Sequence, residues 1–288
     1  MINRMEYKDT TIKSVLDYLS WINETNIVEV PIEGGDSLAF HDDQKYYRGQ
    51  SCICWDLKPS VLRGEAYLDE NALLKKASLR LWNEISSLHS YLEKMIFFQH
   101  YGLSTRLLDV TFNPLVALYM ACCDESKYTC NGVVYFGNKN ESQNTRIADL
   151  TAQYVFEHLL QRYDLDFHDF IDKEGIKVED FTNPIFILPP INNPRIEAQD
   201  GAFIMAPLIE KIVDDKTVLL NRKGLEKSDF FDNRRAVIDK DYKAQIMHEL
   251  SILGINCGSI YKSIEEKLKA IMIEERWNIN KIKIHNVL

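Results

Sequence analysis

The sequence predicts a single α+β domain in which helices surround a sheet. Apolar residues recur at steps of three and four over residues 11–22, 68–95 and 241–253, which indicates amphipathic helices. Short apolar runs bounded by turn residues predict strands instead. These runs lie at residues 27–31, 45–50, 132–136, 186–190, 202–206, 217–220 and 235–238. We find no internal repeat or linker-like tract in the sequence, so we expect one domain and not two.

Composition limits the classes of partner. The chain has 288 residues, 45% of them hydrophobic, and a formal net charge of −9. An acidic chain offers no general attraction to nucleic acid, so a small ligand or a protein partner is favoured. Residues 1–10 are polar, and no stretch approaches the roughly 20 apolar residues of a membrane span. We therefore expect a soluble cytoplasmic protein without a membrane partner.

The six cysteines are scattered along the sequence. Cys52 and Cys54 have no partner pair at the spacing of a zinc site, and the seven histidines do not cluster with them. The sequence therefore predicts structural thiols in a reducing compartment and no metal site.

Two further helices and one unassigned segment complete the outline. Residues 147–163 have helical apolar spacing, and Ser263-Ile264-Glu265-Glu266 is a capping box that begins a helix reaching to about Trp277. Residues 164–181 mix acidic and aromatic side chains without a firm period, so they remain unassigned. Residues 138–144 are expected to form a polar loop.

Chemically able side chains are densest between Phe98 and Cys122. We predict a strand, a turn and then a buried helix here, with Asn113 as N-cap and Pro114 in the first turn. A merely structural segment would not need so many polar groups, so this stretch is the expected centre of a binding or active site. Its polar members are Gln99, His100, Ser104, Thr105, Arg106, Asp109, Thr111 and Asn113.

Arginines lie at two other places where strands or turns end. Arg48 belongs to the predicted strand at 45–50, which Gly49 is expected to end with a sharp turn. There the planar guanidinium can bind a carboxylate or phosphate, although a surface arginine would look the same. Residues 57–63 bring Arg63 into the same region. The polar residues 195–200 precede an apolar strand, which fits either a site at a strand end or a solvated loop.

Several of these segments, in this order, resemble the FRG domain family, which is named for an aromatic-arginine-glycine motif. They are Tyr47-Arg48-Gly49-Gln50, residues 59–63, residues 99–118, and Ala198-Gln199-Asp200-Gly201-Ala202-Phe203. The resemblance covers roughly residues 44–270. It implies an FRG domain at 44–288 that includes the C-terminal helices, with residues 1–43 as a helical and strand extension packed on it. The family's association with prokaryotic defence and toxin-like loci implies a toxin or phage-defence effector, with an antitoxin or defence-system partner.

A second resemblance is to ADP-ribosyltransferases of the arginine-serine-glutamate class. Tyr47-Arg48-Gly49, then Leu103-Ser104-Thr105-Arg106 before a helix, then Glu197 and Gln199 follow the order of that class. The resemblance implies an ADP-ribosyltransferase-like fold, with a mixed, mainly antiparallel sheet and flanking helices, and NAD as substrate. Two departures matter: Arg106 occupies the third position of the serine motif, and the acid Glu197 comes before Gln199.

The resemblance also implies roles for individual residues. Arg48 would bind the dinucleotide, since an arginine fork suits phosphate. Ser104 and Thr105 would orient the ribose, and a carboxylate near the ribose would stabilise the positive charge that develops as nicotinamide leaves. Glu197 or Gln199 would fill that last position. The remaining expected NAD-binding residues are Gln50, Gln99, His100, Tyr101 as a stacking partner of nicotinamide, and Arg106.

Structural alternatives exist for some of these residues. Arg106 and Asp109 could form an internal ion pair, and His100 could be a hydrogen-bonded core residue. A triad of Ser104, His100 and Asp109 has no nucleophile-elbow pattern behind it.

Two functions therefore stay open. One is an NAD-dependent ADP-ribosyltransferase or NAD glycohydrolase acting on a protein or nucleic-acid target. The other is a non-catalytic module of the same fold that binds a nucleotide, a nucleic acid or a protein. Glu197 aimed into the cleft with Arg48 would favour the enzyme, whereas Glu197 turned to solvent would favour the binding module. A two-metal nuclease is disfavoured because the sequence shows no clustered acidic and histidine ligands.

Overall fold

A computed structural model of the chain describes residues 7–31, 37–41, 45–63, 70–138, 144–157, 167–170, 176–189, 194–213, 216–220, 230–263, 266–268 and 270–273. Parts of several predicted segments lie outside these residues. They include most of the loop at 138–144, the end of the helix predicted to reach residue 163, and the end of the helix predicted to reach Trp277.

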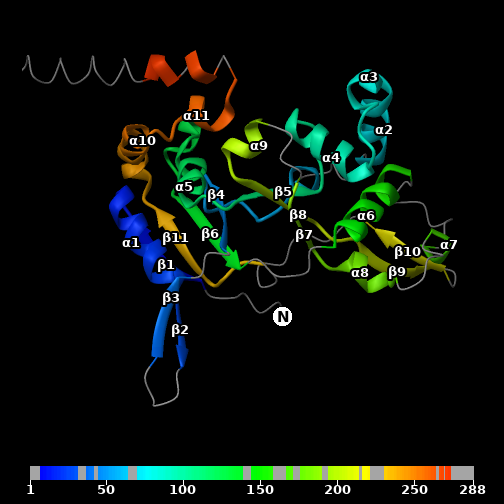
Figure 1. Cartoon of the computed structure of the whole chain (residues 1–288), viewed down its shortest axis with the longest axis horizontal. Coiled ribbons are helices and arrows are strands. Elements are labelled where there is room, and N and C mark those ends of the chain that lie inside the picture. The colour runs from blue at the N-terminus through cyan, green and yellow to red at the C-terminus, as the bar shows by residue number, and fades with distance from the viewer. Residues whose placement is uncertain are drawn as a thin grey trace, which may run out of the picture.

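A seven-stranded sheet forms the centre of the molecule (Figure 1). Its strand order is β1-β11-β6-β4-β5-β8-β7, and only β1 and β11 run parallel to one another. The prediction of a mixed, mainly antiparallel sheet is therefore confirmed. The strands are β1 (Lys8–Ile12), β4 (Lys45–Gln50), β5 (Leu107–Thr111), β6 (Gly132–Asn138), β7 (Ile185–Ile187), β8 (Gly201–Met205) and β11 (Arg234–Ile238).

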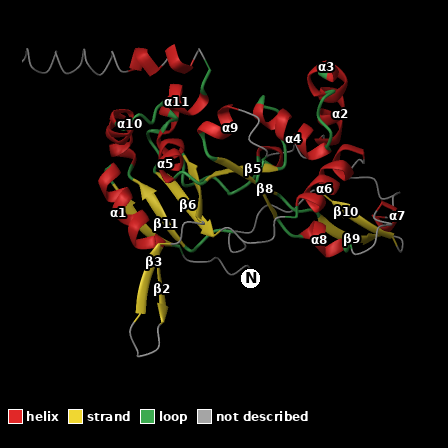
Figure 2. Ribbon diagram, in the orientation of Figure 1, coloured by secondary structure: helices red, strands yellow, loops and turns green. Residues whose placement is uncertain are grey.

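Two short antiparallel ribbons accompany the main sheet. One joins β2 (Ile27–Pro31) to β3 (Ser37–His41), and the other joins β9 (Ile209–Val213) to β10 (Lys216–Leu220). Figure 2 shows that the β2–β3 ribbon projects away from the main sheet, whereas β9 and β10 lie beside the helices α6 and α8.

Helices cover the sheet in two groups (Figure 1). The group beside β6 and β11 contains α1 (Val15–Asn26), α5 (Pro114–Cys122), α10 (Lys243–Ile252) and α11 (Cys257–Tyr261). The group beside β7 and β8 contains α2 (Glu70–Arg80), α3 (Trp82–Ile85), α4 (Tyr91–His100), α6 (Thr145–Glu157), α7 (Phe167–Phe170) and α8 (Val178–Thr182). Between the groups lies α9 (Pro194–Ala198), and the 3-10 turns are η1 (Ser60–Leu62), η3 (Glu125–Lys127) and η5 (Lys240–Tyr242). Among the described helices, none is long and apolar enough to cross a membrane.

The prediction of a single helix over residues 68–95 is wrong, because this stretch divides into α2, α3 and α4. A capping box starts α4 anew: the hydroxyl of Ser90 accepts from the Glu93 backbone N–H at 3.0 Å, and the Glu93 carboxylate accepts from the Ser90 backbone N–H at 3.2 Å. Residues 98–100 are consequently the end of α4 and not the predicted strand. The strand of this stretch is β5, at Leu107–Thr111.

The predicted start of α5 and the predicted end of α10 are confirmed, whereas α10 begins at Lys243, two residues after the predicted start. The side chain of Asn113 accepts from the backbone N–H of Leu115 at 3.0 Å, with Pro114 at the first helical position. Gly254, at φ +80°, follows α10 and lets the chain leave the helix in the left-handed region.

Three apolar clusters hold the sheet and its helices together. Strand residues alternate between the faces: on β6, Val134 and Phe136 pack with α1, α5 and α10, whereas Val133 and Tyr135 pack on the opposite face. The helix-covered face carries two clusters side by side. One involves α1, α5, α10 and α11, and the other involves α2, α4, α6 and α8.

Three of the six cysteines depart from the prediction of separate structural thiols. Cys52, Cys54 and Cys130 converge at one point, whereas Cys122 and Cys257 are buried thiols and Cys123 is partly buried. The structure places the sulfur of Cys52 within bonding distance of the sulfurs of both Cys54 and Cys130.

Candidate functional site

The candidate site lies where two neighbouring strands of the sheet separate. β4 pairs with β6 over six residues, but its pairing with β5 is a single pair, Tyr47 with Thr111. Beyond that pair the two strands leave a pocket of about 240 Å³. Its side chains come from β4, from β5 and from segments far away in the sequence. The polar and aromatic ones include Arg48, Gln50, Trp55, Arg63, Asp109, Arg195, Gln199 and Tyr261.

Arg48 occupies the gap between the strands. Its Nη1 donates to the backbone oxygen of Asp109 at 2.6 Å and lies 3.5 Å from the Asp109 carboxylate, so the guanidinium bridges two strands that hardly pair there. Burial lowers the pKa of Arg48 from its usual value, while Asp109 raises it and Arg63 lowers it further. The Nε of Arg48 is buried and has no hydrogen-bond partner. One donor of the fork is thus left for a ligand.

Gly49, the third residue of the aromatic-arginine-glycine motif, is needed for packing. It lies inside β4 and does not have a positive φ, so the predicted sharp turn at this residue is wrong. A Cβ at this position would overlap the backbone oxygen of Ala117 in α5. The absence of a side chain therefore lets α5 pack directly on β4 beside Arg48.

Two more guanidinium groups line the pocket. Arg63 follows η1, as predicted from residues 57–63, and its Nε donates to the backbone oxygen of Lys58 at 3.1 Å. Arg195, on α9, lies over the ring of Tyr261 at 4.9 Å and donates to the backbone oxygen of His100 at 3.4 Å. With Arg48 these residues bring three positive charges to the pocket, against one described carboxylate, that of Asp109.

Asp109 is held by a short chain of hydrogen bonds. The amide of Gln99 donates to the two carboxylate oxygens at 3.2 and 3.3 Å, and the Thr105 hydroxyl donates to the Gln99 carbonyl oxygen at 2.7 Å. Thr105 in turn accepts from the backbone N–H of Leu107 at 3.2 Å. Gln99 and Thr105 therefore orient Asp109. The buried Thr105 hydroxyl does not face the pocket, which differs from its expected contact with a ribose.

Two glutamines present unused polar atoms to the pocket. The Oε1 of Gln50 and the Nε2 of Gln199 are buried and have no hydrogen-bond partner. With the Nε of Arg48 they make a group of three such atoms in residues that line this pocket. Buried polar atoms are nearly always hydrogen-bonded in folded proteins. A group of three at one pocket therefore points to a ligand that supplies both donors and acceptors.

A smaller pocket of about 30 Å³ adjoins the first and shares Asp109, Arg195 and Gln199 with it. His100 and Gln99 line this second space. Burial, and then the charge of Arg195, lower the pKa of His100 below its usual value of 6.5. These surroundings favour the neutral imidazole, which can both donate and accept hydrogen bonds.

Arg106 does not take part in the site. Its side chain is fully buried and forms an ion pair with Glu70 of α2 at 2.6 Å. The Nη1 of Arg106 also donates to the backbone oxygen of Ala206 at 3.4 Å, and this contact directs the guanidinium into the core. The expected contact of Arg106 with NAD is therefore wrong. The alternative prediction, an ion pair between Arg106 and Asp109, is also wrong, because the partner of Arg106 is Glu70.

Three other expected residues lie outside both pockets. Tyr101 is 68% exposed at the end of α4, where its ring contacts Phe97 and His100. Ser104 is partly buried and lines neither pocket, so it does not join His100 and Asp109 in a triad at this site. Glu197 is exposed on α9 and also lines neither pocket. Of the two candidates for the late position, only Gln199 reaches the site.

Local sequence patterns indicate part of the pocket lining only weakly or not at all. Asp109 is among the polar residues predicted for the site, but no contact with NAD is predicted for it, although its place among polar residues is the signal that it could face a ligand. Arg195 was marked as part of a polar segment before a strand. Nothing in the local sequence of Trp55 or Tyr261 distinguishes them from core aromatic residues.

The comparison with protein families agrees with the motif at the pocket. A family model described as the FRG domain matches residues 43–130. The chain contains an FRG domain. The matched segment of the FRG domain includes Arg48, Arg63 and Asp109, but ends before Arg195 and Gln199. Among curated proteins and among solved structures, none matches the chain.

Proposed function

We propose that the FRG domain of this protein binds a phosphate-bearing nucleotide in the gap between β4 and β5, with NAD as the first candidate. The observation that carries the proposal is the buried Nε of Arg48, which lacks a partner in a pocket lined by two further arginines. A guanidinium in such surroundings is stabilised by an anion that accepts from its planar fork.

The rest of the lining suits the other parts of a nucleotide. Asp109 and the Oε1 of Gln50 can accept from ribose hydroxyls, and the Nε2 of Gln199 can donate to them. Trp55 and Tyr261 offer faces for a planar base. Ligand pockets have volumes of roughly 300 to 1,000 Å³, so one of about 240 Å³ suits half of a dinucleotide, with the remainder lying outside it.

Isothermal titration calorimetry with NAD, ADP-ribose, AMP and adenosine tests this proposal. Binding should require the phosphate, so adenosine should bind much more weakly than AMP. We expect Arg48→Gln to weaken AMP binding about 10- to 100-fold, because a hydrogen bond to a charged group contributes roughly 1.5–3 kcal/mol and about 1.4 kcal/mol is a factor of ten.

Arg146→Ala is the matched control for Arg48→Gln, since Arg146 is exposed on α6 and lines neither pocket. It should bind AMP as the wild type does. Equal binding of adenosine and AMP, or unchanged AMP binding by a folded Arg48→Gln variant, would refute the proposal.

A second candidate function is cleavage of the bound NAD. The observation that favours it is the Asp109 carboxylate, which is 56% exposed, lines both pockets and is held in place by Gln99 and Arg48. In the reaction the bond from C1′ of the ribose to nicotinamide breaks, and its electron pair leaves with nicotinamide. Water then adds to C1′, which gives ADP-ribose and a proton. Asp109 would stabilise the positive charge on the sugar.

Release of nicotinamide from NAD separates the two candidates. If the chain is an enzyme that uses Asp109, Asp109→Asn should abolish release and Glu197→Gln should leave it unchanged. Loss of activity with Glu197→Gln alone would return the catalytic role to Glu197. NAD that stays intact with wild-type protein while AMP still binds would leave the domain as a nucleotide-binding module.

The resemblance alone extends the proposal to a biological role. That role is a toxin or phage-defence effector in the cytoplasm, which would transfer ADP-ribose to a protein or nucleic acid and would be controlled by an antitoxin or another defence component. Expression in bacteria should then arrest growth with the wild type and not with Arg48→Gln. Normal growth with both proteins at equal levels would count against a toxin.

A further inference from the structure

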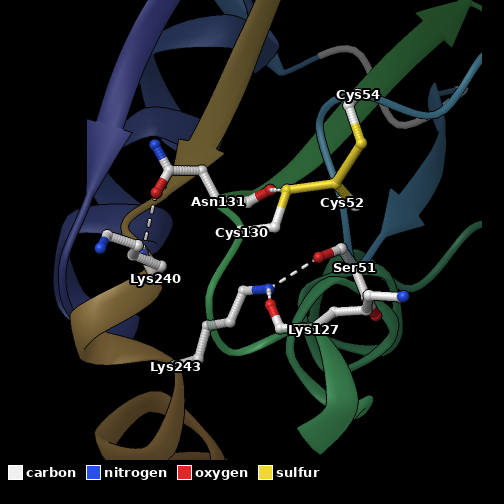
Figure 3. Close-up of a disulfide and its surroundings, with 8 residues drawn as sticks. All are labelled: Ser51, Cys52, Cys54, Lys127, Cys130, Asn131, Lys240 and Lys243. Atoms are coloured by element: carbon white, nitrogen blue, oxygen red, sulfur yellow. Dashed lines mark hydrogen bonds between the residues drawn. A yellow bond between two sulfur atoms is a disulfide. The ribbon is translucent and has the colours of Figure 1, made fainter.

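Three cysteine side chains meet at the base of the loop that follows β4 (Figure 3). Cys52 and Cys54 lie two and four residues after the end of β4, and Cys130 lies two residues before the start of β6. The three sulfur atoms all lie within 4.8 Å of one another. The Cα atom of Cys52 lies 5.3 Å from that of Cys54 and 5.5 Å from that of Cys130.

Two disulfides cannot account for this arrangement. The structure joins the sulfur of Cys52 to both other sulfurs, but a cysteine sulfur forms only one disulfide bond. Two cysteines would be enough to link the two segments covalently. The third thiol at the same point therefore needs another explanation.

The backbone holds the cysteine-bearing segments together without help from sulfur. The N–H of Ile53 donates to the carbonyl oxygen of Asn131 at 2.8 Å, directly between the cysteines. The buried ammonium of Lys243 donates to the carbonyl oxygens of Ser51 at 2.7 Å and Lys127 at 3.0 Å, one on each segment. Figure 3 shows Lys243 reaching between these two oxygens. The three thiols are thus placed in advance, as the ligands of a metal site are.

We propose that Cys52, Cys54 and Cys130 bind one thiophilic metal ion, Zn²⁺, through three thiolates. Zinc–thiolate bonds are about 2.3 Å long, so tetrahedral coordination separates the sulfurs by roughly 3.8 Å. All three sulfurs lie within 4.8 Å of one another, so they are close enough together to share one ion. The described part of the chain contributes three His, Cys, Asp or Glu ligands to this cluster, which leaves the fourth position to water.

The site would anchor a loop that contributes to the pocket. Cys52 and Cys54 begin the segment at residues 51–63, and Trp55 and Arg63 of that segment line the pocket between β4 and β5. Because Cys130 belongs to the segment that enters β6, the metal ion would tie this loop to β6, the strand that pairs with β4. The inference does not depend on what the pocket binds.

Metal content of the purified full-length chain tests the proposal. Protein kept in a non-chelating reductant should contain about one equivalent of Zn²⁺ by elemental analysis, and addition of Zn²⁺ to the stripped protein should release protons from the thiols. Replacement of Zn²⁺ by Co²⁺ should give thiolate-to-cobalt charge-transfer absorption. Cys52→Ser, Cys54→Ser and Cys130→Ser should each reduce affinity for Zn²⁺ at least tenfold in competition with a coloured chelator.

Two variants make the test decisive. Cys54 is exposed, so Cys54→Ser should fold normally, and its loss of metal cannot be assigned to misfolding. Cys123→Ser removes a thiol outside the cluster and should bind Zn²⁺ as the wild type does. Absence of Zn²⁺ binding by the reduced wild type would overturn the proposal. So would equal binding by Cys54→Ser and wild type, or a stoichiometric disulfide from Cys52 to Cys54 or Cys130 in alkylated protein taken directly from cells.

Discussion

Two arginine–acid pairs beside β5 have opposite surroundings. Arg106 and Glu70 are both fully buried, lie 2.6 Å apart and are enclosed by the core between α2 and β8. Arg48 and Asp109 lie 3.5 Å apart in the pocket, with 16% and 56% of their side chains exposed, and the Nε of Arg48 has no partner. The first pair is complete within the protein. The second pair leaves one hydrogen-bond donor of Arg48 unused, and we assign this donor to a ligand.

The contrast shows why arginine at a motif position does not by itself indicate a ligand site. Both residues are charged, partly or wholly buried, and close to an acid. What separates them is whether the protein satisfies the guanidinium. For Arg106, Glu70 and the backbone of Ala206 accept its hydrogen bonds. For Arg48, Asp109 supplies the acceptors for Nη1, and the buried Nε has no acceptor.

The largest effect should come from breaking the buried pair. Arg106→Ala leaves the Glu70 carboxylate uncompensated in the core, which costs about 3–5 kcal/mol of unfolding free energy. Arg48→Ala removes a hydrogen bond at the edge of a pocket that water can enter, and should cost about 1 kcal/mol. Urea unfolding followed by circular dichroism measures both values.

A double variant provides the control for this prediction. Arg106→Met with Glu70→Leu removes both charges and should recover most of the stability that Arg106→Ala loses. If Arg48→Ala and Arg106→Ala lower the unfolding free energy equally, the distinction between the satisfied pair, Arg106–Glu70, and the open pair, Arg48–Asp109, would be wrong.

A smaller effect is expected at Gly49, whose lack of a side chain fixes the position of the open pair. Gly49→Ala places a methyl group against the Ala117 backbone, so β4 and α5 must move apart at a cost of about 1–3 kcal/mol. Because Arg48 is the preceding residue, AMP affinity should fall as well. Gly201→Ala in β8 is the control, since its Cβ would meet the nearest atom at an ordinary 3.4 Å. Equal unfolding free energies for the two variants would mean that the strand, and not α5, limits this position.

The smallest expected effect is a pH dependence next to the open pair. The pKa of His100 is lowered in the folded protein, mainly by burial, whereas the unfolded chain titrates near the usual 6.5. Below pH 6.5 the unfolded chain therefore binds more protons, and the unfolding free energy falls as the pH drops from 6.5 towards the folded pKa. Urea midpoints at pH 7.5 and 5.5 should differ less for His100→Asn than for the wild type. Identical differences in the two proteins would show that the pocket does not disfavour the protonated imidazole.

The sequence predicted those features that neighbouring residues determine. The cap at Asn113, the end of the helix predicted over 241–253, the apolar strand at 132–136 and the arrival of Arg63 near Arg48 all follow from local patterns. The prediction of one helix over residues 68–95 failed because the apolar periodicity continued through residues 81–90. The Ser90 capping box contained the signal that a new helix starts there. Helix length was inferred from spacing, whereas the cap decided it.

Features that depend on distant contacts could not be predicted. Arg106 finds its acid 36 residues earlier in the sequence, so no local pattern could choose Glu70 over Asp109. Glu197 and Gln199 are two residues apart, yet only the turn after α9 decides which one reaches the pocket. Cys130 joins Cys52 across 78 residues because β4 and β6 are neighbours in the sheet, and spacing rules for metal sites do not include sheet topology.

The strand order has a practical consequence for the segment that carries the FRG match. Residues 43–130 contain β4 and β5, which share one residue pair, while β6 and β8, the strands that hydrogen-bond to them along their length, come later in the chain. A fragment trimmed to the match would keep the signature residues but expose two bare strand edges, a surface prone to aggregation. Domain boundaries taken from that signature should therefore be extended at least to β11, and to β1 at the other end, before the fragment is expressed.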